Sequence, residues 1–155
     1  MKFYQHQSLK KYNTFGLDVY AMYFVEYGSE DELLEILSSE VVSKNPLLAV
    51  GQGSNLLFLK DFDGVVVHSA LKGITRIEET EDSVVLEVGS GVVWDDLVEH
   101  CVQHGWHGIE NLSLIPGEVG ASAIQNIGAY GVELKDVLQK VKAVRIADGE
   151  TKIFT

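Results

Sequence analysis

A glycine-rich segment of low charge, IPGEVGASAIQNIGAYG at residues 115–131, constrains the fold of this chain more than any other stretch. It contains four glycines and one proline, and its single charged residue is Glu118. Such a backbone is too rich in glycine for an ordinary helix and too uncharged for an ordinary surface loop. Because compact domains rarely carry a long irregular segment without a role, we expect it to contact a ligand. The alternative is a structural loop that fills a domain interface.

A second glycine-rich stretch, LLAVGQGSNLLF, spans residues 47–58. Its apolar start predicts a buried strand, and Gly51 and Gly53 then permit a backbone with positive φ, whose successive N–H groups can bind an anion. Ser54 and Asn55 add side-chain donors. The stretch lacks the third glycine of a dinucleotide fingerprint and the lysine of a P-loop, so it indicates neither. The alternative is a simple β-turn.

Composition excludes several other classes. The chain has 155 residues, of which 46% are hydrophobic, enough for one domain or two small ones. A net charge of -11 argues against a nucleic-acid partner. The only cysteine, Cys101, permits no internal disulfide, and we expect it in the core of a helix. Neither a signal peptide nor an apolar run long enough for a membrane span is present, so a cytoplasmic protein is expected.

Hydrophobic periodicity predicts a mixed α/β order of elements. Ser29 followed by Glu32 has the spacing of a capping box at the start of a helix over 30–38. A second helix is expected over Trp94–Gln103. The predicted strands lie at 19–27, 47–51, 63–69, 73–79 and 83–89, and Asp148-Gly149 joins a final hairpin. The boundary between two strand-rich parts is expected near residue 70.

Three histidines, His100, His104 and His107, have the spacing of one helix face but do not indicate a metal site. The helix is expected to end before His107, and no cysteine pair or flanking carboxylate completes a zinc ligand set. These histidines are therefore expected to be solvated, and no metal is predicted. Asp95 and Asp96 are expected in the first turn of the same helix, where they favour its dipole.

Five sequence blocks together point to a known family: NTFG (13–16), GQGSN (51–55), GSGVVWDDLV (89–98), GIENLSLIPGEVGASAIQNIGAYGVEL (108–134) and ADG (147–149). In this order they resemble the N-terminal part of the UDP-N-acetylenolpyruvoylglucosamine reductases, flavoenzymes of bacterial cell-wall precursor synthesis. The resemblance covers essentially the whole chain. The block over 108–134 is very specific, whereas GxGSN is shared across the wider vanillyl-alcohol-oxidase type of flavin fold.

This resemblance implies an α+β, two-lobed FAD-binding domain of the vanillyl-alcohol-oxidase/PCMH type. The lobes would be residues 1–70 and 71–155, with FAD extended between them. On the family pattern the pyrophosphate would be bound by Gly51, Gly53, Ser54, Asn55 and Leu56. The flavin and its ribityl-phosphate arm would be lined by Pro116, Gly117, Gly120, Ala121, Ser122, Ile124, Asn126 and Gly128. Tyr130 and Gly131 would stand near the flavin and the substrate. Bulk at Gly117, Gly120 or Gly128 is expected to clash with FAD.

The implied reaction is reduction of the enolpyruvyl group of a UDP-sugar by NADPH through FAD, giving UDP-N-acetylmuramate. The expected partner is this nucleotide sugar, without nucleic acid or membrane, and the intact protein is expected to be a monomer. The family's catalytic arginine, serine and glutamate come after the ADG hairpin. No catalytic residue is therefore assigned within these 155 residues, and alone they are expected to be inactive. Two alternatives stay open: an FAD-dependent oxidase of the same wider fold, and a non-catalytic interaction module.

Overall fold

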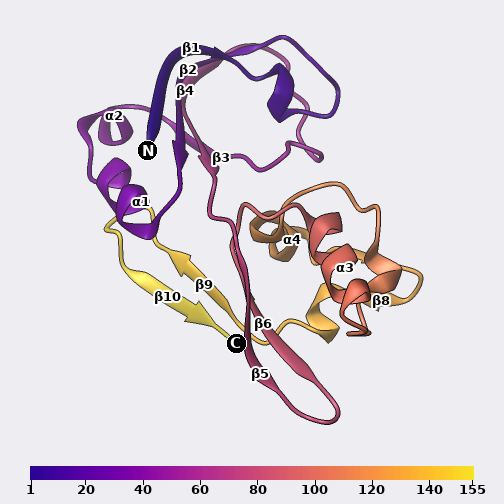
Figure 1. The fold of residues 1–155 in the computed structure, drawn as a ribbon. Helices are drawn as coiled ribbons and strands as arrows, with labels where there is room; N and C mark the ends of the chain where they lie inside the picture. Colours follow the sequence, from indigo (N-terminus) through magenta and orange to yellow (C-terminus); the bar gives the residue numbers. More distant parts are fainter. The chain divides into compact units, whose positions relative to one another are not determined.

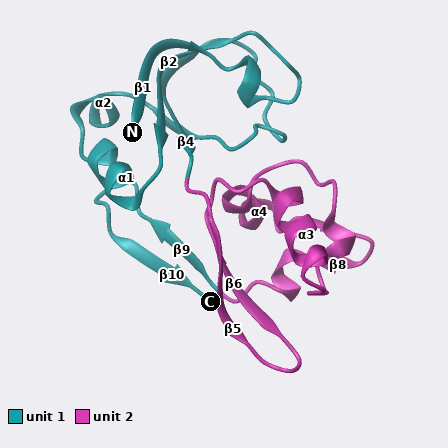
Figure 2. Ribbon diagram, in the orientation of Figure 1, with its two compact units in different colours: residues 1–70, 140–155 teal, residues 71–139 magenta.

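The structure, a computed structural model, describes residues 1–155 and contains two compact units. Unit 1 comprises residues 1–70 and 140–155, and unit 2 comprises residues 71–139 (Figure 2). The first boundary lies between Ala70 and Leu71, and the division into FAD-binding lobes 1–70 and 71–155 stays a prediction. The last segment, 140–155, groups with unit 1, whereas the expected second lobe included it. Unit 2 is thus inserted within the sequence of unit 1.

Unit 1 is built on a four-stranded mixed sheet in the order β1-β2-β4-β3 (Figure 1). Its strands are β1 (Lys2–Ser8), β2 (Tyr20–Tyr27), β3 (Leu47–Ala49) and β4 (Phe62–Ser69). β1 runs antiparallel to β2, whereas β2 and β3 both run parallel to β4. Phe3 and Tyr4 were interpreted as strand and core residues, but the bounds of β1 were not predicted, because its side chains are mostly exposed and do not alternate between apolar and polar types.

Three consecutive valines make β4 the buried centre of this sheet. Val65 and Val67 pack in a cluster with Ile36 of helix α1 (Glu30–Leu37), and Val66 packs in a second cluster with Phe24. Alternate side chains of a strand point to opposite faces, so β4 contributes to both clusters. The helices of unit 1 are α1 (Glu30–Leu37), α2 (Glu40–Lys44) and the 3-10 turn η1 (Lys10–Tyr12).

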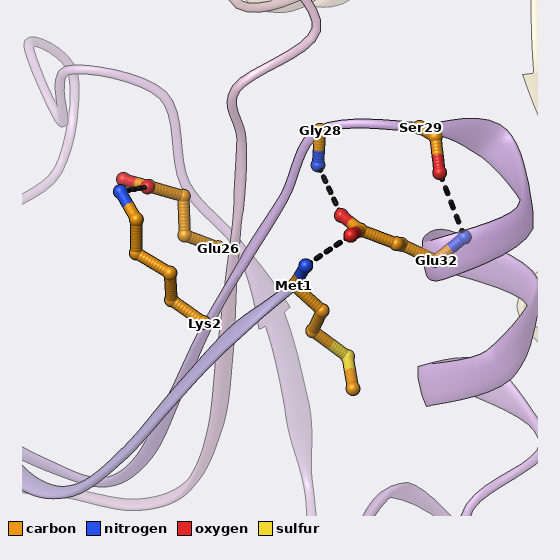
Figure 3. Close-up of polar contacts among 6 residues, drawn as sticks. All are labelled: Met1, Lys2, Glu26, Gly28, Ser29 and Glu32. Carbon is orange, nitrogen blue, oxygen red and sulfur yellow. Dashed lines mark hydrogen bonds and ion pairs between the residues drawn. The ribbon is translucent and has the colours of Figure 1, made fainter.

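Helix α1 begins at the predicted cap (Figure 3). The Ser29 hydroxyl accepts a hydrogen bond from the Glu32 N–H at 3.2 Å. The Glu32 carboxylate accepts the N–H of Gly28 at 2.7 Å and pairs with the amino terminus at Met1. The Gly28 N–H and then the Met1 amine hold the pKa of Glu32 below its ordinary value. Glu32 therefore bonds one residue before the cap, which is a variant of the predicted capping box.

The predicted C-terminal hairpin is confirmed as β9 (Val141–Val144) and β10 (Thr151–Phe154). Its turn contains Gly149 at φ 75°, and the guanidinium Nε of Arg145 donates to Asp148 at 2.8 Å. Lys142 donates to the Glu30 carboxylate of α1 at 2.6 Å. This ion pair links the hairpin to the rest of unit 1.

Unit 2 has its core around helix α3 (Trp94–Gln103), which has the predicted bounds. Its buried residues include Trp94, Leu97, Val98 and Cys101. Burial raises the pKa of the Cys101 thiol, as expected for a core cysteine. The predicted pair of strands before it is confirmed as β5 (Ile74–Glu79) and β6 (Val84–Val88), which pair antiparallel. None of the helices reaches the length and apolarity needed to cross a membrane.

The glycine-rich segment contains a helix, so the expectation that it is too rich in glycine for one was wrong. Helix α4 (Val119–Gln125) begins after Gly117 and ends at Asn126, whose φ of 45° is left-handed. The glycine at position 120 of this helix is explained by a close contact with a distant part of the chain. A Cβ there would lie 2.6 Å from the Cβ of Ser90, whose carbonyl accepts the Gly120 N–H at 2.8 Å.

A two-residue hairpin completes the segment. Strands β7 (Gly128–Ala129) and β8 (Val132–Glu133) are joined by Tyr130 and Gly131, both with positive φ. A two-residue loop with positive φ at both positions matches the right-handed twist of paired strands. The remaining short elements of unit 2 are the 3-10 turns η2 (Glu110–Leu112) and η3 (Leu134–Asp136).

Candidate functional site

The GQGSN turn leaves the carboxyl end of β3, where strand β3 stops pairing with β4. The Val50 N–H donates to the Val67 carbonyl at 2.9 Å, and the His68 imidazole Nδ1 lies 3.0 Å from the Val50 carbonyl oxygen. Both backbone groups of Val50 are therefore held by β4 before the chain turns at Gly51. In open α/β sheets, ligands bind beyond the carboxyl ends of the parallel strands, so this turn is well placed to contact a ligand.

Gly53 is required by the protein itself. It is buried and has φ 64°, and a Cβ there would lie 2.0 Å from the carbonyl oxygen of Tyr12. Leu56 is half-buried and packs against the core of unit 1. Ser54 is half-buried and Asn55 is exposed. The polar surface of the turn is thus formed by its backbone together with Ser54 and Asn55.

The loop that contains the NTFG block packs against this turn and supports it. The buried Asn13 amide donates to the carbonyls of Leu9 at 2.8 Å and Leu17 at 3.0 Å, and its oxygen accepts the Leu17 N–H at 2.9 Å. Asn13 therefore closes the loop that carries Tyr12, whose carbonyl meets Gly53. An amide side chain that satisfies several backbone groups fixes a loop more firmly than an apolar residue can.

In unit 2 the residues that lead into α3 run beside the glycine-rich segment and hold its start. The Trp94 N–H donates to the Gly117 carbonyl at 3.0 Å, and the Val119 N–H donates to the Val92 carbonyl at 2.9 Å. The buried Trp94 indole donates to the Leu112 carbonyl at 2.8 Å. The GSGVVWDDLV block therefore fixes the backbone of the IPGEVG block, although 18 residues separate Trp94 from Leu112.

Asp95 adds a side-chain contact that the sequence did not predict. One carboxylate oxygen accepts the Ser113 hydroxyl at 2.8 Å and the Leu114 N–H at 2.7 Å. The Leu114 N–H and then the Ser113 hydroxyl hold the pKa of Asp95 below its ordinary value. Only the dipole role had been expected from the sequence, because the pairing depends on the fold of a loop 18 residues away.

Apolar side chains of this segment project into solvent. Ile124 on α4 is 85% exposed and Tyr130 is 91% exposed. Leu114, just before the segment, is 82% exposed, and Leu114, Asn126 and Tyr130 all have positive φ. Left-handed backbone at non-glycine residues is costly and gathers at functional sites. Exposed apolar groups on such a backbone form a surface suited to an apolar or aromatic ligand.

Other predicted site residues face inward or are half-buried. The buried Ser122 donates its hydroxyl to the Val119 carbonyl at 2.6 Å, and Ala121 is half-buried beside it. Gly128 lies in β7, where a Cβ would meet the Val132 carbonyl oxygen at 3.0 Å. A Cβ at Gly120 would thus clash with the chain itself, and one at Gly128 would make a tight contact with it. The expected clash with FAD at these positions stays a prediction.

An open hollow of about 550 Å³ lies over the end of the segment. It is lined by Asn126, Gly128, Ala129, Gly131, Val132, Glu133, Lys135 and Asp136. The Asn126 side-chain oxygen accepts the Lys135 N–H at 2.9 Å, which ties the end of α4 to η3. Pro116 is exposed at the other end of the segment.

Sequence reasoning also assigned no role to Glu118, a carboxylate residue only 5% exposed.

His104 and His107 are exposed, as expected, whereas His100 is half-buried, and the rings of His100 and His104 contact Trp106. The His104 ring lies 4.2 Å from the His100 ring and 4.6 Å from the Trp106 ring, centroid to centroid. The chain contains no group of three or more His, Cys, Asp or Glu residues arranged to hold a metal ion.

The sequence profile of the FAD binding domain family matches residues 21–155, and the chain belongs to this family. Its α+β fold agrees with that membership. The chain is 56% identical over 150 residues to a UDP-N-acetylenolpyruvoylglucosamine reductase of Bacteroides fragilis, covering 97% of this chain and 45% of that enzyme. A reductase of the same name from Porphyromonas gingivalis is 45% identical over 150 residues, covering 97% of this chain and 44% of that enzyme.

Among solved structures, the crystal structure of UDP-N-acetylenolpyruvylglucosamine reductase from Thermus caldophilus matches with a TM-score of 0.74 at 25% identity. The match covers 99% of this chain and 51% of that chain. The chain thus spans about half the length of the reductases it matches, namely 45% of the Bacteroides fragilis enzyme.

Proposed function

We propose that this chain is the FAD-binding part of a UDP-N-acetylenolpyruvoylglucosamine reductase. The observation that carries the proposal is the pair of segments, GQGSN and IPGEVGASAIQNIGAYG, each fixed on a rigid support by the protein's own contacts. Both lie in a chain that is 56% identical over 150 residues to such a reductase. A cofactor site needs this combination of exposed backbone and rigid support.

The GQGSN turn would hold the pyrophosphate through backbone N–H groups and the side chains of Ser54 and Asn55. Neither glycine-rich segment contains a lysine or an arginine. Peptide dipoles are therefore the main source of positive potential there, which is how anion nests work. Gly51 and Gly53 allow the turn, and β4 and Tyr12 fix its position.

The segment 115–131 would bind the flavin and its ribityl-phosphate arm. Ile124 and Tyr130 offer exposed apolar surface of the kind that an aromatic ring system covers. Pro116 and Gly117 would lie along the arm, and Gly131 beside the substrate. Ser122, Gly120 and Gly128 would contribute indirectly, because their contacts with other parts of the chain keep the backbone of the segment in place.

When bound, FAD supplies hydride transfer from NADPH to the enolpyruvyl double bond of the UDP-sugar. The residues described here would bind and orient the cofactor and would exclude water from one face of it. The acid that protonates the neighbouring carbon is assigned to no residue of this chain. We further propose that the whole protein acts as a monomer on the nucleotide sugar.

The test uses the natural protein in full, incubated with FAD, separated by gel filtration and examined by visible absorption. We expect retained flavin bands. The variant Ile124→Glu should weaken FAD binding by at least about tenfold, because it places a charge where the flavin would lie. Val102→Glu is the matched control, since Val102 is an exposed apolar residue of unit 2 on α3, 54% exposed and outside the segment.

The assigned site would be contradicted if Ile124→Glu left FAD affinity unchanged, or if Val102→Glu weakened FAD affinity equally. A protein that retains no flavin would contradict the proposed function itself. With FAD bound, NADPH oxidation that depends on the UDP-sugar distinguishes a reductase from an oxidase, which would consume oxygen instead.

A further inference from the structure

Asp95 makes the one side-chain contact to Leu114 described above, at the entry to the segment 115–131. Its carboxylate accepts the Leu114 N–H at 2.7 Å and the Ser113 hydroxyl at 2.8 Å. Hydrogen bonds to an ionised carboxylate are shorter and stronger than those between neutral groups. Two of them on one oxygen atom hold the loop firmly to the first turn of α3.

Leu114 has a backbone conformation that its own side chain does not favour. Its φ of 62° is left-handed, which is costly for a residue with a Cβ. Its side chain is 82% exposed, so burial of apolar surface does not repay that cost. The hydrogen bond from the Leu114 N–H to Asp95 is an interaction that offsets this cost.

The backbone on either side of Leu114 is tied to α3 by Trp94. The Trp94 indole bonds the Leu112 carbonyl, and the Trp94 N–H bonds the Gly117 carbonyl. Between the two points held by Trp94, the hydrogen bonds to Asp95 fix the direction in which the chain turns at Leu114. A change of Leu114 to negative φ would redirect Ile115 and Pro116 while both ends stay fixed.

We propose that Asp95 is a positioning residue for the cofactor. Through Leu114 it sets the path by which the chain enters Pro116 and Gly117, and FAD affinity depends on it without any contact between its carboxylate and FAD. This inference rests on the proposed function of the segment 115–131.

The competing explanation is that Asp95 serves only the helix dipole, and its neighbour separates the two. Asp96 carries the same charge in the same first turn of α3 and is exposed. A dipole effect would therefore be shared by both residues. A positioning effect belongs to Asp95 alone.

The experiment measures FAD dissociation constants of the natural protein in full by flavin fluorescence, for the parent and for Asp95→Ala, Asp95→Asn and Asp96→Ala. We expect Asp95→Ala to weaken binding about tenfold, a change typical of losing one hydrogen bond to a charged group. Asp95→Asn should stay within about threefold, because its amide oxygen still accepts the Leu114 N–H. Asp96→Ala should bind as the parent does.

Circular dichroism of each variant without FAD checks that it is folded. If Asp95→Ala folds poorly, Asp95→Ala combined with Leu114→Gly replaces it, since glycine adopts positive φ freely and needs no clamp. This double variant should fold and should bind FAD as the parent does, and a loss of affinity in a folded double variant would contradict the inference.

The inference is overturned if Asp95→Ala binds FAD like the parent, if Asp96→Ala is weakened equally, or if Asp95→Asn is as weak as Asp95→Ala. In those cases the parent still binds FAD, so the proposed function stands. A parent protein without FAD affinity overturns the proposed function and the inference with it.

Discussion

Replacing Gly53 with alanine should destabilise the protein even in the absence of any cofactor. The added Cβ would lie 2.0 Å from the Tyr12 carbonyl oxygen and 2.9 Å from the Asn13 Cα, and both neighbours are backbone atoms that cannot rotate away. The backbone at Gly53 also has φ 64°. Two separate penalties therefore act at one position, one conformational and one steric.

Gly16 isolates the conformational penalty. Its φ of 65° is nearly that of Gly53, but no atom lies within 4 Å of a Cβ built there. We expect Gly16→Ala to cost about 1–2 kcal/mol of stability, the usual penalty of a left-handed alanine. Gly53→Ala adds a clash worth about 1–3 kcal/mol when the surroundings shift to relieve it. Its total cost should therefore be about 2–5 kcal/mol.

Urea unfolding of the natural protein without FAD, followed by circular dichroism, measures both variants. The midpoints are comparable when the slope of the unfolding free energy against urea is the same as in the parent. Equal destabilisation by Gly16→Ala and Gly53→Ala would refute the reasoning, because it would leave no room for the contact with Tyr12.

Two further predictions concern the first turn of α1. Ser29→Ala should cost about 1 kcal/mol in the same unfolding assay, because the Glu32 N–H loses its cap; Ser38→Ala, at the other end of the helix, is the comparison, and an equal loss there would contradict this. The folded pKa of Glu32 is lowered, so its contribution to stability is present above its unfolded pKa and is lost as pH falls through the folded value. Glu32→Gln should flatten the loss of stability below about pH 4.3; an unaltered curve for Glu32→Gln would disprove the assignment.

Local signals in the sequence were sufficient for the elements whose stability is local. Helix α3 has the predicted bounds, and α1 begins at the predicted Ser29 cap and ends at Leu37, one residue before the expected end. The Asp148-Gly149 turn likewise predicted the last hairpin. In each case apolar periodicity, a cap or a turn dipeptide lies within the element itself.

The parts that the sequence did not predict depend on contacts between distant residues. Helix α4 contains Gly120 because its backbone approaches Ser90, and no local pattern announces that approach. The role of Asp95 depends on left-handed Leu114, 19 residues away. Gly53, Gly120 and Gly128 each lie close to other atoms of the chain, and composition cannot distinguish such a contact from contact with a ligand.

The insertion of unit 2 within unit 1 has a consequence for synthesis on the ribosome. Residues 71–139 leave the ribosome before the hairpin β9–β10, which belongs to unit 1 and bonds α1 through Lys142 and Glu30. Chains emerge from the N-terminus, and compact parts fold as units as they appear. Unit 2 can therefore complete its core around α3 while unit 1 still lacks its last two strands. The four-stranded sheet of unit 1 therefore emerges first and unit 2 second, and the hairpin joins unit 1 only after both.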